Sequence, residues 1–69
     1  MKLGEYTRSL GWSISELARQ ASMDFNTARK ALEGQSISAR SANKIASALS
    51  KALGERILVT DIEDLKVGS

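Results

Sequence analysis

The sequence contains no cysteine, histidine or proline, and its only aromatic residues are Tyr6, Trp12 and Phe25. Without cysteine, neither a disulfide nor a thiolate-bound metal supports the fold. The lack of histidine removes the commonest general base and the usual zinc ligand. The sequence therefore predicts no catalytic residue, no metal site and no cofactor, and it argues against an enzyme.

Long apolar runs are also missing. No run approaches the roughly 20 residues that a membrane-spanning helix needs, and residues 1–10 lack the apolar segment of a signal peptide. The 69 residues are enough for one domain, residues 1–69. We expect a cytoplasmic protein that does not contact a membrane.

The charge is unevenly distributed, although its net value is only +2. Residues 1–51 contain eight Lys or Arg against four Asp or Glu, whereas residues 52–69 contain two against four. A basic body favours a polyanionic partner such as nucleic acid, but an ordinary solvated surface gives the same distribution.

Apolar residues recur three and four positions apart along most of the chain, which is the spacing of helices with one buried face. The spacing predicts helices over residues 3–10, 14–21, 25–33 and 39–53, ended by Gly11, Ser22, Gly34 and Gly54. The longest apolar stripe predicts the buried face of the fourth helix: Ala42, Ile45, Ala46, Leu49, Ala52 and Leu53. We expect an all-α fold, a compact bundle of four to five helices whose core lies in residues 1–54.

Helix-capping residues mark the starts of these helices. Ser13 and Glu16 have the spacing of a capping box, and Asp24 and Ser38 are good N-cap residues. These roles occupy acidic residues that could otherwise act as general acids, and Glu33 is expected to pair with Lys30 on the helix surface.

The C-terminal tail, residues 55–69, has no single interpretation. Residues 56–60 fit either a strand or an extended connector. A second capping box at residues 60–63 favours a short helix that continues to Leu65, and residues 67–69 are expected to fray. The tail is more apolar than a fifth helix needs, and we predict that part of it forms a dimer contact: Ile57, Leu58, Val59, Ile62 and Leu65.

The third predicted helix has a polar outer face. At 100° per residue, Ala28, Ala31 and Leu32 define its buried side. The opposite side carries Asn26, Arg29, Lys30 and Glu33, with Phe25 and Thr27 at its borders. Asn, Arg and Lys are the residue types that read base edges, and Phe can contact a thymine methyl group. A solvated helix face has the same composition, and for Phe25 the alternative, a partly buried packing residue, is favoured.

Residues 12–34, WSISELARQASMDFNTARKALEG, resemble the helix-turn-helix of the phage lambda-type repressor and Cro family (the XRE family). The resemblance rests on the Ser13 cap, Glu16-Leu17-Ala18, the joint Ser22-Met23, the polar helix from Asp24 to Leu32, and Glu33-Gly34. The segment SISARSANKIASAL that follows resembles the fourth helix of the family. The resemblance covers residues 3–53 and implies a lambda-repressor-like fold.

The family resemblance also implies a function: a sequence-specific regulator of transcription, encoded by a bacterium or phage, that binds double-stranded DNA. A homodimer would insert the third helix of each protomer, about residues 24–33, into successive major grooves of a pseudo-palindromic operator. The implied base contacts are Phe25, Asn26, Arg29 and Lys30. The implied phosphate contacts are Ser15 with the first amides of the second helix, Thr27, Gln35, Ser36 and Arg40; the last two could instead only cap and solvate the fourth helix.

Two residues depart from the family pattern. Ser22 stands where the family usually has a glycine with positive φ, and Ile14 stands where it often has a glutamine that touches DNA. We expect Ser22 to adopt a left-handed backbone and Ile14 to face the core.

A protein–protein interaction module, such as an antitoxin or regulatory adaptor, is the alternative function, because one scaffold serves many functions and a net charge of +2 is low for a DNA-binding protein.

Overall fold

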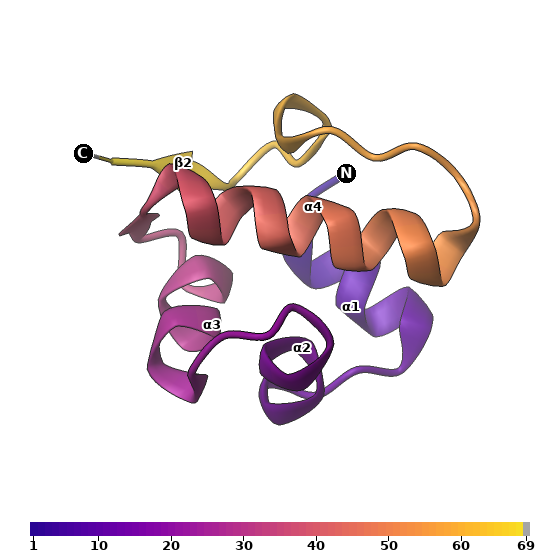
Figure 1. The fold of residues 1–69 in the computed structure, drawn as a ribbon, viewed down its shortest axis with the longest axis horizontal. Coiled ribbons are helices and arrows are strands. Elements are labelled where there is room, and N and C mark those ends of the chain that lie inside the picture. Colours follow the sequence, from indigo (N-terminus) through magenta and orange to yellow (C-terminus); the bar gives the residue numbers. More distant parts are fainter. Residues whose placement is uncertain (69) are drawn as a thin grey trace.

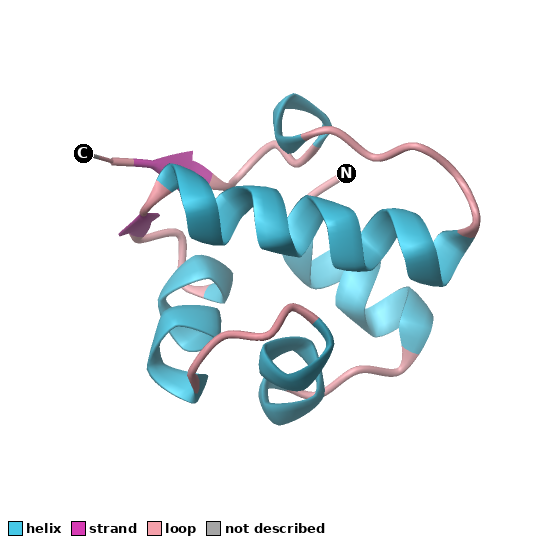
Figure 2. Ribbon diagram, in the orientation of Figure 1, coloured by secondary structure: helices cyan, strands magenta, loops and turns pink. Residues whose placement is uncertain are grey.

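Four α-helices dominate the fold, as the apolar spacing predicted (Figures 1 and 2). The computed structural model describes residues 1–68. Within this range the helices are α1 (Leu3–Leu10), α2 (Ile14–Gln20), α3 (Phe25–Leu32) and α4 (Ala39–Leu53). A 3-10 helix, η1 (Val59–Asp61), and two strands, β1 (Ser36–Ile37) and β2 (Lys66–Val67), complete the fold. In Figure 1, α4 crosses the molecule, with α1, α2 and α3 on one side and the C-terminal segment on the other.

The helix ends follow the local chemistry of the sequence. The Ser13 hydroxyl accepts a hydrogen bond from the Glu16 amide at 3.2 Å, and the Ser38 hydroxyl accepts one from the Ser41 amide at 3.1 Å. Gly11 and Gly54 end α1 and α4 with left-handed backbones, φ 72° and 69°, which glycine adopts without steric cost.

Only one of the two hydrogen bonds of the capping box predicted for α2 forms, the one from the Glu16 amide to the Ser13 hydroxyl. The Glu16 carboxylate accepts hydrogen bonds from Arg19, at 2.7 and 2.9 Å, and from Gln20, at 2.7 Å, instead of reaching back to Ser13. These partners, Gln20 first and then Arg19, lower the pKa of Glu16.

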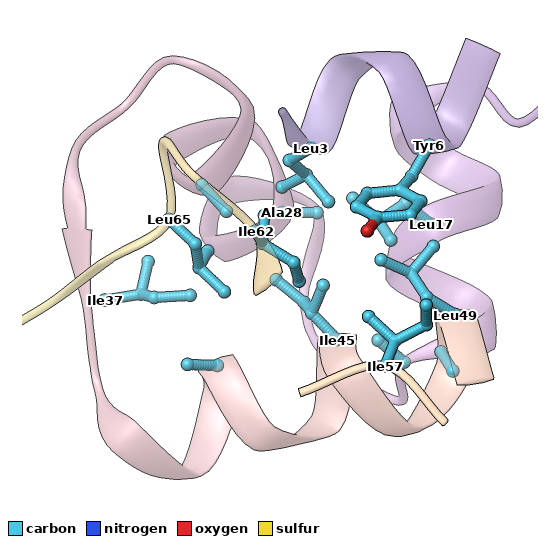
Figure 3. Packing of buried hydrophobic residues seen from close by; sticks show 14 of the residues in the cluster. Leu3, Tyr6, Leu17, Ala28, Ile37, Ile45, Leu49, Ile57, Ile62 and Leu65 are labelled. Atoms are coloured by element: carbon cyan, nitrogen blue, oxygen red, sulfur yellow. The ribbon is translucent and has the colours of Figure 1, made fainter. Parts of the chain in front are cut away.

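The core is a single cluster to which every helix contributes (Figure 3). Leu3, Leu17, Ile45 and Leu49 are completely buried. Burying an aliphatic side chain of this size contributes about 1.5–3 kcal/mol. Ala28 and Ala31 are also fully buried, and their small size lets α3 pack closely. The apolar stripe predicted for α4 is buried from Ala42 to Leu49, but Ala52 is exposed.

The C-terminal segment packs on the core, so that fewer of its apolar residues are left for the predicted dimer contact. Ile57, Ile62 and Leu65 are 6, 2 and 9% exposed, leaving Leu58 exposed and Val59 half-buried. The Ser50 hydroxyl of α4 accepts the amide of Ile57 at 2.8 Å, which ties the start of this segment to the bundle.

The predicted short helix through Leu65 was wrong. The 3-10 helix η1 ends at Asp61, whose carboxylate accepts the Leu58 amide at 2.9 Å. Asp64 accepts the amide of Leu3 at 2.7 Å, and the Glu63 amide donates to the Met1 carbonyl at 3.1 Å. These contacts with the start of α1 override the local capping pattern, and residues 56–58 form a connector.

The two strands pair in parallel, an element that the all-α prediction lacked. Ser36 pairs with Lys66 and Ile37 with Val67, and the Gly68 amide donates to the Ile37 carbonyl at 2.9 Å. Residues 67 and 68 are therefore held in place, contrary to the predicted fraying, while Ser69 lies outside the described residues. Strands of two residues leave no alternation in the sequence by which to recognise them.

None of the helices in residues 1–68 has the length and apolar content needed to cross a membrane.

Candidate nucleic-acid interface

The outer face of α3 is exposed as the helical spacing predicted. Asn26, Arg29 and Lys30 are exposed, whereas Ala28 and Ala31 on the opposite side are fully buried. Leu32 is half-buried and packs against the core. The burial of two alanines fixes the rotation of α3, so that its three polar side chains project together from one surface.

Phe25, the first residue of α3, is 47% exposed. It lies at the edge of the polar face and not in the core. An aromatic ring at this position can contact a thymine methyl group or another apolar surface of a partner.

The joint between α2 and α3 has the left-handed backbone that the family resemblance implied. Ser22 has a φ of 54°, and it is the one residue other than glycine with positive φ in the part of the chain that the structure describes. A left-handed conformation costs a non-glycine residue about 1–2 kcal/mol. The Met23 amide closes the joint by donating to the Ala18 carbonyl at 2.9 Å.

A lysine from α4 supports this joint. The Lys44 ammonium donates a hydrogen bond to the Ser22 carbonyl at 3.2 Å. The contact spans 22 residues of sequence, so local patterns gave no sign of it. Lys44 thereby links α4 to the turn that sets the position of α3.

The first turn of α3 is held by Asp24 and Thr27. Asp24 is the N-cap residue, but its carboxylate accepts from the Thr27 hydroxyl at 2.6 Å and not from a backbone amide. This hydrogen bond is the main cause of the lowered pKa of Asp24. The Thr27 hydroxyl proton is used in this hydrogen bond. To donate to a phosphate, the hydroxyl would first have to release Asp24.

The negative charge of Glu33 offsets part of the positive charge on the outer face of α3. Glu33 lies 3.6 Å from Arg29, and not against Lys30 as predicted, and it accepts from the Gln35 amide group at 3.0 Å. Because Arg29 and Glu33 are both about half exposed, with side chains 45 and 46% accessible, their pair contributes only about 0.2–1 kcal/mol. Arg29 can therefore exchange this partner for a base at little cost.

Three other predicted phosphate contacts lie outside α3, on exposed residues of other elements. Ser15 lies in the first turn of α2, Ser36 in β1 and Arg40 in the first turn of α4, and all three are exposed. Ile14 is half-buried and packs against the core, as expected. One amide at the start of α2, that of Glu16, is already taken by Ser13.

An apolar groove lies at the other end of α4. Side chains from residues 43–51 of α4 and from residues 54–59 line it, with Ala46, Ile57, Leu58 and Val59 as its apolar residues. Leu58 is 47% exposed. Charged residues of both signs, Lys51, Glu55 and Arg56, lie around these side chains.

Within residues 1–68, no three potential metal-ligating side chains lie together. Comparisons of the chain with models of protein families, with curated proteins and with solved structures found no match.

Proposed function

We propose that this chain is a sequence-specific DNA-binding regulator of transcription that inserts α3 into the major groove. The observation that carries the proposal is the outer face of α3, which exposes Asn26, Arg29 and Lys30 beside Phe25 while the alanines behind them are buried.

These side chains suit the chemistry of base edges. Asn makes two hydrogen bonds with adenine, and Arg or Lys does so with guanine. An α-helix with its side chains is about 10–12 Å across, which matches a major groove about 12 Å wide. A helix with such a face can enter the groove without distorting the duplex.

The packing of α2 and α3 supports the same function. The two helices lie against each other across the Ser22 joint, an arrangement similar to the helix-turn-helix of the XRE family. In that arrangement α2 crosses the DNA backbone while α3 reads the bases. Lys44, through the Ser22 carbonyl, would keep α3 at a fixed angle to the rest of the domain.

A homodimer would place two copies of α3 one helical turn apart on a pseudo-palindromic operator. The groove beside Leu58 is the surface that best suits this contact. It combines the exposed apolar side chain of Leu58 with charged residues of both signs, Lys51, Arg56 and Glu55. A two-fold axis through the groove would place this same surface of one copy against that of the other.

The groove also favours a second candidate, a protein–protein interaction module that binds a different partner there. Salt dependence separates the two functions. Contacts with phosphates make DNA affinity fall steeply as salt rises.

Arg29→Ala tests the leading proposal, with Arg8→Ala on α1 as the matched control. We expect Arg29→Ala to cost about 1–3 kcal/mol of binding free energy for the preferred duplex and to relax the preference at one base pair. Arg8→Ala should leave the base preference unchanged and should lower the affinity only by the small effect of one lost charge. Negligible affinity of the unaltered chain for every duplex at low salt would overturn the proposal in favour of the interaction module.

A further inference from the structure

We propose that β2 supplies a further contact with the DNA backbone, Lys66. The inference rests on the DNA-binding function proposed above. It extends the binding surface to a segment that lies some 30 residues from α3 in the sequence and that sequence analysis assigned to the tail.

The parallel pairing places Lys66 directly beside a predicted phosphate contact. Ser36 and Lys66 are register partners, and both are exposed. Side chains of paired residues in adjacent strands project from the same face of a sheet. Ile37, the residue after Ser36, is 6% exposed and points into the core. Lys66 therefore leaves the sheet on the outer face, next to the Ser36 hydroxyl.

The position of β2 joins Lys66 to the rest of the candidate interface. β1 packs against the end of α3, and β2 packs against both β1 and α4. Figure 1 shows β2 beside the start of α4, at the end of the molecule where α3 and β1 lie. Arg40 is in that first turn of α4, and Gln35 precedes β1. Lys66 thus adds a positive charge on a strand that packs against the elements carrying two predicted phosphate contacts, Ser36 and Arg40.

The charges of the C-terminal segment are separated by the fold. Asp64 accepts the Leu3 amide at 2.7 Å, and the Glu63 amide donates to the Met1 carbonyl, so this acidic part lies against the start of α1. Lys66, two residues later, lies against β1 instead. A segment with a net negative charge thus presents a lysine to the α3 side of the molecule. A lysine on a flexible stem suits a phosphate, which it can meet from several directions.

Gly68 holds β2 close to β1. Its amide donates to the Ile37 carbonyl at 2.9 Å, and a Cβ atom added at Gly68 would lie 2.9 Å from the Ser36 Cβ. A larger residue at this position would push β2 away from β1. Gly68→Val therefore moves Lys66 without changing the charge of the chain.

The experiment measures the affinity for a random-sequence duplex of about 20 base pairs, two helical turns, over a fourfold range of salt. The chains compared are the unaltered protein, Lys66→Gln, Gly68→Val and the control Lys2→Gln, which removes the same charge at the start of α1. Each phosphate contact contributes about 0.9 to the slope of log affinity against log salt. Thermal unfolding of each variant reports whether it folds.

We expect Lys66→Gln to make the slope shallower by about 0.9, so that the variant loses about 3.5-fold less affinity than the unaltered protein over the fourfold rise in salt. Gly68→Val should give the same change if it folds, and Lys2→Gln should leave the slope unchanged. If the unaltered chain binds and Lys66→Gln keeps its slope, Lys66 is not a phosphate contact, although the proposed function stands. If the unaltered chain binds no duplex at low salt, both proposals fail.

Discussion

The ammonium of Lys44 donates a hydrogen bond to the carbonyl of Ser22 at 3.2 Å, joining the long helix α4 to the left-handed turn between α2 and α3. Ser22 is the residue with the left-handed backbone, and Lys44 gives its carbonyl a hydrogen-bond donor from outside the turn. The position of α3, and with it the direction of its polar face, depends on this joint.

Ser22→Gly should stabilise the protein. Glycine removes the cost of about 1–2 kcal/mol for a left-handed serine but adds roughly 0.5–1 kcal/mol of chain entropy on folding. We expect a net gain of about 0.5 kcal/mol, a rise of about 2–4 °C in Tm. Thermal unfolding followed by circular dichroism measures it.

The matched control is Ser47→Gly, an exposed serine within α4. Its backbone is helical, so glycine there should lower the stability by about 0.5 kcal/mol. Equal losses at both positions would show that Ser22 carries no strain.

Lys44→Met should destabilise the domain, because it leaves the Ser22 carbonyl without this donor. A hydrogen bond of this kind contributes about 0.5–1.5 kcal/mol, and the exposure of Lys44 places the expected loss in the lower half of that range. Lys44→Arg keeps a donor and should retain most of the stability. Denaturant unfolding of the three chains decides it; a Lys44→Met variant as stable as Lys44→Arg would mean that the contact contributes nothing.

Leu58→Glu should abolish the proposed homodimer. The side chain is 47% exposed and adds little to the core, so the variant should keep its fold and its Tm. Sedimentation at high micromolar concentration should show a dimer for the unaltered chain and for Leu58→Met, and a monomer for Leu58→Glu. A strictly monomeric unaltered chain contradicts the dimer.

Stability should fall at alkaline pH through Tyr6. Burial, followed by the nearby carboxylate of Asp61, raises the pKa of this hydroxyl above its usual value of 10.0. In the unfolded chain Tyr6 loses its proton at lower pH, so the folded state binds more protons and stability drops as pH rises above 10. The free energy of unfolding of Tyr6→Phe should fall less over this range. Parallel curves for the two chains would contradict the expectation.

The helical part of the fold could be predicted because its signals are local. Ser13, Ser38, Gly11 and Gly54 act within one turn of the helix that they begin or end. The apolar spacing of α3 gave the rotation of the helix, and this fixed which of its side chains are exposed. The left-handed Ser22 was expected from the resemblance of residues 12–34 to the XRE-family pattern.

The remaining features depend on contacts between distant residues. Lys44 donates to Ser22, which lies 22 positions away in the sequence, Lys66 pairs with Ser36 from another strand, and Asp64 accepts a hydrogen bond from Leu3 at the start of α1. The spacing of apolar residues along the sequence gives no sign of such pairs. With these long-range contacts the chain forms η1 in place of the expected fifth helix. They also place Ile57 and Ile62 in the core, which leaves Leu58 and Val59 for the predicted dimer contact.

Selection of bound duplexes from a random pool tests most directly the claim that α3 reads DNA sequence. We expect a pseudo-palindromic consensus whose half-sites lie about 10 base pairs apart, centre to centre. We also expect Arg29→Ala to lose the preference at one base pair in each half-site. A pool that shows no consensus after repeated rounds at low salt would contradict sequence reading by α3.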